Sequence, residues 1–405
     1  MPVPADRSRL RALLSLAFEW TAPLDARVGW LAEARLGPLP LPLVFVALVL
    51  LANLALNLVS NISPGFDDRE QLADMATWAW GYRGVQPPLH TWLIKLVDLV
   101  VGSDIAAIYV TRSAVLCVLA ALLYRIGREL QLSRQGASAA ALGLFLMPTV
   151  GWEAQRSFSH SLSGMLFTTL FQLAVLMLLR RRTSGAYALT GAAAALALLG
   201  KYNSFIGLAG AACASVLLPE VRKRQEARGL LVAAAVCAAI LAAPLAWLVA
   251  GRLETLDDSA GKFHFHGSGS FFLDRLEGAG EFALNTVSYG GPLIVLALVA
   301  GLVAAIDGRL VHGGLARLGA GTRYLLTAIT ASFLLAFSLV ILSGTTEVKG
   351  YWLHPVLITL PAAAAAILEA VDSTGWANRF LIFCAALLAV ASVAAFTLRA
   401  FGIGM

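Results

Sequence analysis

Apolar residues recur along the whole chain in runs of about 15 to 22, broken by short clusters of Arg, Asp, Gly and Pro. This pattern predicts a bundle of membrane-spanning α-helices, because a helix needs about 20 apolar residues to cross the hydrocarbon core of a bilayer. A transmembrane β-barrel would show weaker, alternating segments. We predict about eleven spans, over residues 40–60, 104–126, 136–150, 161–179, 185–200, 203–218, 230–250, 288–306, 324–343, 353–371 and 380–400.

The composition supports an integral membrane protein and excludes several other classes. Mean hydropathy is +0.78, and only 13% of the residues are charged, about half the share in soluble domains. The formal charge of +6 comes from arginines in short loops, so it indicates membrane topology and no nucleic-acid partner. The cysteines lie inside apolar runs without CxxC spacing, which favours small core residues over a disulfide or zinc site.

The basic residues predict an orientation. With a cytoplasmic N-terminus, the inside loops hold most of the 30 Lys and Arg residues, as the positive-inside rule requires. The polar loops 61–103 and 251–287 then emerge on the outer face, together with shorter polar loops. A transporter would more often place polar groups at the bilayer midplane and show an internal repeat, and we find no convincing repeat. Polar chemistry is therefore expected on the outer face.

The predicted organisation has two parts. Residues 1–39 form a cytoplasmic or interfacial segment, within which Ser8–Trp20 has the pattern of an amphipathic helix lying on the membrane surface. Residues 40–405 form one transmembrane domain, without a separate soluble domain at the C-terminus.

The first outer loop holds the most unusual segment, FDDREQLADMATWAWGYRGVQPPLHTWL, over residues 66–93. Asp67 and Asp68 fall where a helix would start, as capping or solvated carboxylates or as part of a site. Pro87 and Pro88 break that helix and suit the first turn of another. An aromatic belt accounts for the tryptophans by themselves, but the Pro-Pro break predicts two amphipathic helices at the interface.

Several charged residues lie where the topology does not require them. Lys201 and Lys349 are outer-face cations, for which snorkelling and phosphate binding both stay open. Arg112 lies inside a predicted span, and we expect it to snorkel to the outer surface or to pair with an outer carboxylate rather than line a pore. His264 and His266 form an HxH pair without a third ligand nearby in sequence, so a loop is favoured over a metal site.

Four blocks resemble those of the GT-C superfamily of membrane glycosyltransferases that use lipid-linked sugars, nearest to family 39 and the aminoarabinose transferase-like group. They are FDDREQ with GYRGVQPPLHTWL, WEAQRSFSHSLSGMLFTTLFQLAVLMLLRRR, LALLGKYNSFIG and EVKGYWLHP. The blocks follow the family order from about residue 60 to 360. The resemblance implies a polyprenyl phosphate monosaccharide as donor and transfer with inversion on the outer side of the membrane. That side agrees with the side derived from the arginines.

The resemblance also implies roles for single residues. Asp67 matches the first acid of the family pair and would be the general base, with Asp68 as second candidate. The leaving phosphate needs cations rather than an acid. The implied donor-phosphate ligands are Lys201, Lys349 and Arg156, and the implied substrate contacts are Tyr202, His90, His160 and Trp352. No cofactor is required, although a divalent metal is possible because some relatives hold one near this loop.

Many family members continue beyond the late Lys block, whereas this sequence ends after one or two further helices. This departure favours an acceptor met within the membrane, or indicates a shortened member with altered activity. We expect an enzyme of the bacterial inner membrane that modifies lipid A, lipopolysaccharide core or another envelope glycolipid. A protein O-glycosyltransferase and, from a different class, a flippase of lipid-linked sugars are the alternatives.

Overall fold

The computed structural model describes residues 25–60, 64–82, 86–250, 270–311 and 313–402. They form a helical bundle with one short antiparallel pair, β1 (Arg35–Leu36) and β2 (Leu39–Pro40). The α-helices are α2 (Leu41–Val59), α3 (Phe66–Asp74), α4 (Leu89–Val101), α5 (Asp104–Glu129), α6 (Arg134–Leu142), α7 (Pro148–Gly151), α8 (His160–Leu178), α9 (Ser184–Gly200), α10 (Phe205–Leu217), α11 (Pro219–Arg222), α12 (Ala227–Val249), α14 (Phe271–Ile306), α15 (Ala320–Ser343), α16 (His354–Leu357), α17 (Leu360–Val371) and α18 (Trp376–Ala400). The 3₁₀ turns are η1 (Gly143–Leu146), η2 (Glu153–Gln155), η3 (Tyr202–Ser204), η4 (Leu315–Arg317) and η5 (Gly350–Leu353).

The all-helical membrane architecture is confirmed. Within the described part, 7 helices are long and apolar enough to cross a bilayer, namely α2, α5, α8, α12, α14, α15 and α18. The segment from η5 to α17 adds an eighth if its two halves, bent by 50°, count as one span. The apolar segments Ser184–Gly200 and Tyr202–Leu217 are shorter. The predicted number of about eleven spans is not confirmed.

The prediction of one span over residues 136–150 is wrong. This segment is divided into α6, η1 and α7, and nearly all of it is buried inside the protein. The break follows from close packing: a Cβ on Gly143 would lie 2.7 Å from Pro361 on α17, while Pro148 starts α7 as its first residue. The small apolar residues of this segment therefore face other helices rather than lipid.

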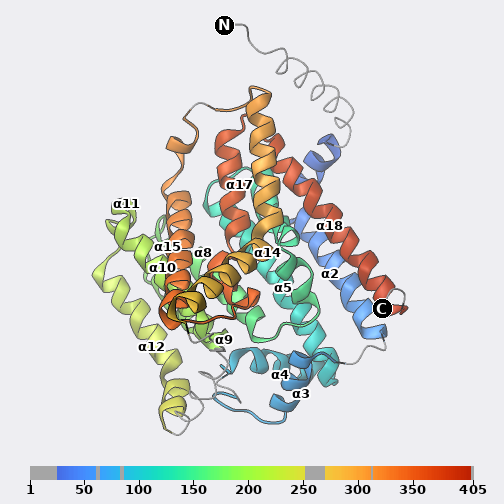
Figure 1. Ribbon diagram of the computed structural model, residues 1–405, viewed down its shortest axis with the longest axis vertical. Coiled ribbons are helices and arrows are strands. Elements are labelled where there is room, and N and C mark those ends of the chain that lie inside the picture. Colours follow the sequence, from blue (N-terminus) through green and yellow to red (C-terminus); the bar gives the residue numbers. More distant parts are fainter. Residues whose placement is uncertain (1–24, 61–63, 83–85, 251–269, 312, 403–405) are drawn as a thin grey trace.

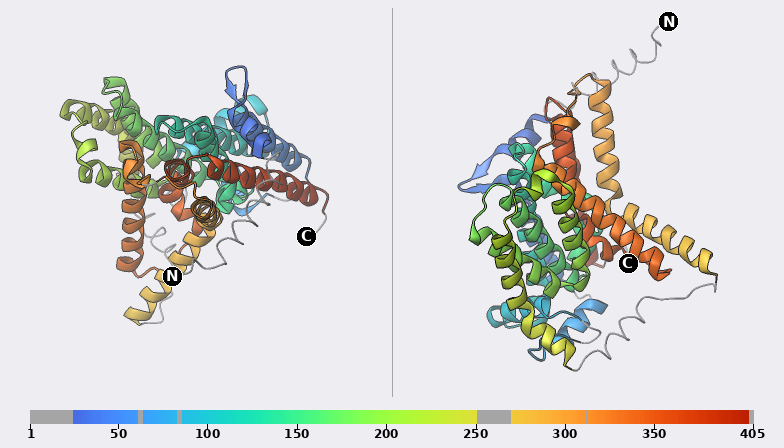
Figure 2. Two further views of the ribbon diagram at one scale, coloured as in Figure 1. Left: turned by 90° about the horizontal axis from the view of Figure 1, so that it is seen from above. Right: turned by 90° about the vertical axis from the view of Figure 1, so that its left-hand side faces the viewer.

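Helix α14 begins earlier than the sequence predicted. It runs from Phe271 for 36 residues, so part of the expected outer loop 251–287 is helical, and residues 251–269 lie outside the described chain. Figures 1 and 2 show that the two halves of α14 differ in direction, the first half projecting from the side of the bundle. Pro292 lies inside the helix, and an internal proline removes a backbone hydrogen bond and bends a helix.

Helices α3 and α4 lie across one end of the bundle, which we call the α3/α4 end (Figure 1). The predicted helix pair with a Pro-Pro break is confirmed, because α4 begins at Leu89 directly after Pro88. Met75, Ile94 and Ile108 bury their side chains together and attach the pair to α5. Trp78 remains exposed, as expected of an aromatic residue at a membrane interface.

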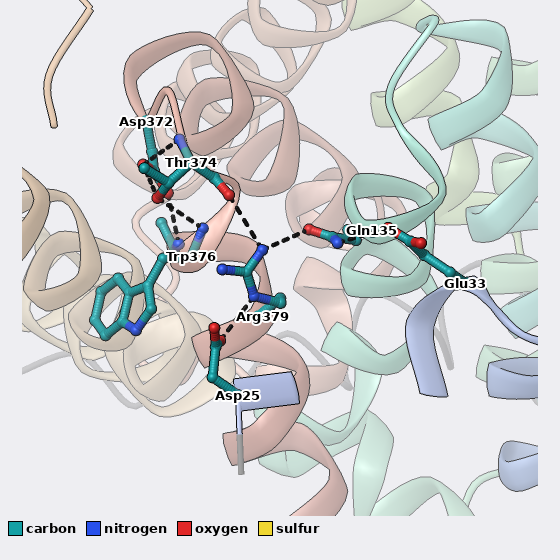
Figure 3. Close-up of polar contacts among 8 residues, drawn as sticks. Asp25, Glu33, Gln135, Asp372, Thr374, Trp376 and Arg379 are labelled. Atoms are coloured by element: carbon teal, nitrogen blue, oxygen red, sulfur yellow. Dashed lines mark hydrogen bonds and ion pairs between the residues drawn. The ribbon is translucent and has the colours of Figure 1, made fainter. Parts of the chain in front are cut away.

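A separate polar network fixes the opposite end of the bundle, at the turn between α17 and α18 (Figure 3). Arg379 donates to Asp25 Oδ1 at 2.7 Å and to Gln135 Oε1 at 3.1 Å. Asp372 accepts a 2.7 Å bond from the backbone N–H of Ala377 in the first turn of α18. These bonds join the start of the described chain to α6 and α18, far from the α3/α4 end. The expected amphipathic helix over 8–20 lies outside the described residues.

Candidate active site

Helix α3 places the acidic pair in its first turn. The backbone N–H of Gly65 donates to Asp68 Oδ2 at 3.1 Å, so the Asp68 carboxylate helps to start the helix. Two acids in the first turn also favour helix formation, because the N-terminal end of a helix carries partial positive charge. The capping role that the sequence allowed for this pair therefore belongs to Asp68.

Asp68 and Arg112 form a buried ion pair between α3 and α5. Arg112 Nη2 lies 2.5 Å from Asp68 Oδ1, and the two side chains are only 4% and 3% exposed. The expected pairing of Arg112 with a nearby carboxylate is thus confirmed. Breaking such a pair leaves an uncompensated buried charge, so Asp68 is a structural anchor and a poor candidate for a base that must bind and release protons.

Asp67 is the neighbouring acid and has a different environment. Its side chain is half-buried, and burial, followed by repulsion from Glu70, raises its pKa from 3.8 to about 6. Arg112 and Lys201 act in the opposite direction. A carboxylate with a pKa near neutrality is a stronger proton acceptor than an ordinary aspartate and is still ionised at pH 7. Of the two acids, Asp67 has the properties of a general base.

Lys201 ends α9 close to this acid. Its Nζ donates to Ser161 Oγ at 2.5 Å and to the Tyr351 carbonyl at 3.3 Å, and lies 4.6 Å from the centroid of the Tyr351 ring. Burial lowers the pKa of Lys201 to about 7, against the attraction of Asp67. Gly164 permits the close approach of α8, since a Cβ there would lie 2.8 Å from Lys201 Cβ. The ammonium group is positioned and would be stabilised by an added anion.

Two buried histidines lie at the starts of α4 and α8, the latter being the helix whose Ser161 contacts Lys201. His90, in the first turn of α4, shares a 2.9 Å hydrogen bond between its Nδ1 and Ser163 Oγ. Its ring centroid is 5.7 Å from that of His160, and both residues are buried. Burial, then the charges of His160 and Arg112, hold the pKa of His90 well below its usual value. His90 is therefore neutral and suited to hydrogen bonding rather than to binding an anion by charge.

The two remaining blocks of the resemblance meet at this position. Asn203 Nδ2 donates to the Trp352 carbonyl at 3.2 Å, which joins η3 to η5. Tyr202, next to Lys201, is half-buried, and burial raises the pKa of its hydroxyl. The backbone of Trp352 and the side chain of Tyr351 therefore close one side of the Lys201 environment.

Lys349 is placed differently from Lys201. Its Nζ lies 2.9 Å from Glu347 Oε2, and both side chains are nearly half exposed. The hydrogen bond to Glu347 raises the pKa of Lys349. An exposed ion pair of this kind contributes little to stability. Lys349 lies two residues before Tyr351, which contacts Lys201.

Arg156 belongs to another group of residues at the α3/α4 end. It follows η2, and its guanidinium carbon lies 5.0 Å from the centroid of the Trp152 ring. Its electrostatic neighbour is Arg399 on α18. Arg156 and Lys201 are thus held by different elements.

Three contributing residues were not predicted: Ser161 and Ser163 at the start of α8, and Tyr351 in η5. The two serines had a signal in the sequence, because the run SFSHSLS places several polar side chains at the beginning of an apolar span. Tyr351 had none beyond its position beside Lys349.

A metal site receives no support from the described residues. Among them, no group of three or more His, Cys, Asp or Glu side chains converges to hold an ion. His264 and His266 lie outside the described chain. The possible divalent metal therefore stays a prediction, and the chemistry below uses only protein side chains.

Comparison with known proteins places this chain in a class. The family model for dolichyl-phosphate-mannose-protein mannosyltransferases matches residues 85–247. The lipopolysaccharide core galacturonosyltransferase RgtB of Rhizobium johnstonii is 27% identical over 345 residues, covering 84% of this chain and 67% of RgtB. RgtA from the same organism is 26% identical over 345 residues, covering 83% and 66%. The chain thus spans about two thirds of the length of these relatives.

The fold has a solved counterpart. The crystal structure of ArnT from Cupriavidus metallidurans bound to undecaprenyl phosphate superposes with a TM-score of 0.60, covering 89% of this chain and 76% of ArnT at 14% identity. The chain is therefore a membrane glycosyltransferase of the GT-C superfamily, as the four sequence blocks indicated. It is an enzyme with a polytopic helical transmembrane domain.

Proposed function

We propose that this enzyme transfers one monosaccharide from a polyprenyl phosphate donor to a hydroxyl group of an envelope glycolipid, with inversion at the anomeric carbon. The observation that carries the proposal is the electrostatic interaction between Asp67 and Lys201. Each shifts the pKa of the other, and they supply a base and a cation from different parts of the chain. Such a pair suits a displacement in which a proton leaves one partner and a phosphate leaves the other.

In the proposed step, the Asp67 carboxylate accepts the proton of the acceptor hydroxyl while its oxygen forms a bond to the anomeric carbon. The bond from that carbon to the phosphate oxygen breaks, and the electron pair leaves with the phosphate. Polyprenyl phosphate gains one negative charge, which the Lys201 ammonium stabilises. Attack opposite the leaving group inverts the anomeric configuration. Asp67 then releases its proton to water.

The residues around the pair take supporting roles in this proposal. Neutral His90 and buried His160 line the side formed by α4 and α8, where hydrogen bonds to sugar hydroxyls are expected. Tyr202 and Trp352 border the donor side next to Lys201. Lys349 is a secondary cation for the donor phosphate, because its side chain is exposed and paired with Glu347.

The acceptor and location also belong to the proposal. RgtA and RgtB are named for transfer to lipopolysaccharide core, and the ArnT structure holds undecaprenyl phosphate, which supports a lipid carrier and a glycolipid acceptor. The lipopolysaccharide in the names of RgtA and RgtB supports a bacterial inner membrane, and the distribution of arginines supports a cytoplasmic N-terminus and a periplasmic site. The match to the mannosyltransferase family keeps a protein acceptor as the second candidate.

Purified enzyme tests the proposal directly. It is incubated with undecaprenyl phosphate galacturonic acid, chosen from the names of the relatives, and with lipopolysaccharide core as acceptor. The proposal expects a glycosylated lipid and one free undecaprenyl phosphate per transfer. A flippase would move the carrier across vesicles without releasing undecaprenyl phosphate, and glycosylation of a peptide instead of the lipid would indicate the second candidate.

A further inference from the structure

We propose that three arginines at the α3/α4 end form a binding site for an acidic group, a phosphate or a carboxylate, on the acceptor. The residues are Arg112 on α5, Arg156 after η2, and Arg399 in the last turn of α18. We call them the arginine cluster. The proposal rests on the proposed function, since it assigns a chemical property to the acceptor of that reaction.

The cluster is held together by contacts between η2 and α18. Trp152, which lies under the Arg156 guanidinium, packs edge-on against Phe396 with ring centroids 4.9 Å apart. Phe396 precedes Arg399 by three residues, about one helical turn. Arg399 interacts electrostatically with Arg156, Arg112 and the carboxylate of Asp68. Side chains far apart in sequence thus converge on one place.

Buried hydrogen bonds fix the backbone beneath these side chains. Asn53 on α2 donates to Gln155 Oε1 at 2.6 Å and to Ser392 Oγ on α18 at 3.1 Å. Gln155 is the residue before Arg156, and Ser392 lies two turns before Arg399. Asn53 therefore holds the backbone segments that carry Arg156 and Arg399 in a fixed position relative to each other.

The charges of the cluster do not balance. Three guanidinium groups, which remain charged in proteins, lie near two carboxylates: Asp68, which already binds Arg112, and Asp67, which also interacts with Arg112. Each arginine also keeps a buried N–H group without a hydrogen-bond partner in the described part of the protein: Nε of Arg112, Nε of Arg156 and Nη1 of Arg399. Buried donors without a partner are costly. An oxyanion between these groups would satisfy both the charges and the donors.

The division of cations between two sets of elements assigns this anion to the acceptor. Asp67 interacts electrostatically with both Arg112 and Lys201, and Lys201 is held by α8, α9 and η5 rather than by the elements of the cluster. Inversion requires the leaving phosphate and the incoming hydroxyl on opposite sides of the anomeric carbon. With the donor phosphate at Lys201, the cluster supplies the cations that remain for the molecule that brings the hydroxyl. Arg156 thus receives a different role from the donor-phosphate contact implied by the resemblance.

Binding measurements without turnover test this proposal on the full chain in detergent. The probes are Kdo₂-lipid A, which carries phosphates and carboxylates, the same lipid with these groups removed or reduced, and undecaprenyl phosphate. R156Q and R399Q are expected to weaken binding of the acidic lipid by at least about tenfold and to change undecaprenyl phosphate binding by less than about twofold. K201M is expected to show the reverse. R275Q serves as the matched control, because Arg275 is stacked on Phe271 of α14. It is expected to change the binding of neither lipid.

Wild-type protein gives a second readout that no folding defect can affect. It is expected to bind Kdo₂-lipid A at least about tenfold more tightly than the lipid without acidic groups. Equal affinity of the wild-type protein for the two lipids overturns the proposal. Loss of undecaprenyl phosphate binding in R156Q and R399Q also overturns it, because the cluster would then bind the donor. The proposal is also overturned if R156Q and R399Q weaken binding to phosphatidylglycerol vesicles as much as binding to Kdo₂-lipid A, because the cluster would then bind anionic membrane lipids in general. Because no sugar is transferred, binding can succeed while the proposed reaction fails, and the two outcomes are distinguishable.

Discussion

Asp68 is bound to Arg112 across 2.5 Å in the protein interior, while its neighbour Asp67 is half-buried with a raised pKa. One turn of α3 thus holds a buried, ion-paired acid beside a half-buried acid with a raised pKa. The sequence alone presented them as two candidates for the same role. The ion pair separates the roles, and it gives opposite expectations for the two substitutions.

Asp67→Asn is expected to abolish transfer without harming the fold. Loss of a general base costs about 10²-fold or more in kcat, because the acceptor hydroxyl keeps its proton during attack. Asp68→Asn is the matched comparison: it leaves Arg112 without a charged partner and is expected to destabilise the protein by about 3 kcal/mol. Transfer rates and thermal unfolding of the two purified variants separate these effects.

Asp67→Asn is also expected to raise the unfolding temperature at pH 7.5. The folded protein raises the pKa of Asp67 from 3.8 to about 6, so it holds this proton more tightly than the unfolded chain does. Stability is therefore lost as the pH rises from about 4 to about 6, and the ionised side chain lowers stability above that range. The gain in Asp67→Asn should disappear near pH 4. A gain that persists there would have a cause other than ionisation.

The pH dependence of kcat/KM is expected to be bell-shaped. The rate rises as Asp67 loses its proton, with a pKa of about 6, and falls as Lys201 loses its charge, with a pKa of about 7. Because the two groups interact, the two apparent pKa values of the profile belong to the pair rather than to either residue alone. Lys201→Arg keeps its charge, so it should remove the alkaline limb from a profile measured from about pH 5 to 9. An unchanged alkaline limb would mean that another group is responsible.

Gly164→Ala tests the position of Lys201 from the side of α8. Its Cβ would come within 2.8 Å of Lys201 Cβ and is expected to shift the ammonium group away from Ser161, lowering kcat/KM for the donor about tenfold. Gly185→Ala is the control, since the space at Gly185 is open. Steady-state kinetics at varied donor concentration distinguish the two. Equal rates in both variants would show that the Lys201 position does not limit the reaction.

Arg379→Gln tests whether the two ends of the bundle are independent. Arg379 links Asp25 and Gln135 at the end away from α3 and α4 (Figure 3). Loss of these bonds is expected to lower the unfolding temperature while kcat/KM and its pH profile stay as in the wild type. A changed pH profile would reveal coupling between the network and the active site.

The hydrophobic pattern predicted those helices that face lipid along much of their length. The spans 40–60, 104–126 and 380–400 correspond to α2, α5 and α18, because a lipid-facing helix must be apolar over its whole length. The segment 136–150 is equally apolar but is covered by protein. It therefore does not need to form one continuous helix, and the helix is interrupted at Gly143 and Pro148. Hydropathy does not distinguish burial in lipid from burial in protein.

The site was predictable where its groups are close in sequence. The Pro-Pro break of residues 66–93 predicted α3 and α4, and the acidic pair made Asp67 a candidate base. The distinction between Asp67 and Asp68 required the position of Arg112, and the environment of Lys201 required Tyr351, which lies 150 residues further along the chain. Arg399 gave no signal, because an arginine near a helix end usually interacts with lipid head groups.

In the proposed reaction, this chain adds a sugar to an envelope glycolipid with Asp67 as base. Mass spectrometry of glycolipids from cells that lack the gene and express either wild-type enzyme or Asp67→Asn at equal levels tests it most directly, without prior choice of the sugar. We expect a glycolipid heavier by one monosaccharide with the wild-type enzyme and none with Asp67→Asn. The same added mass in both strains, or no added mass in either, would contradict it.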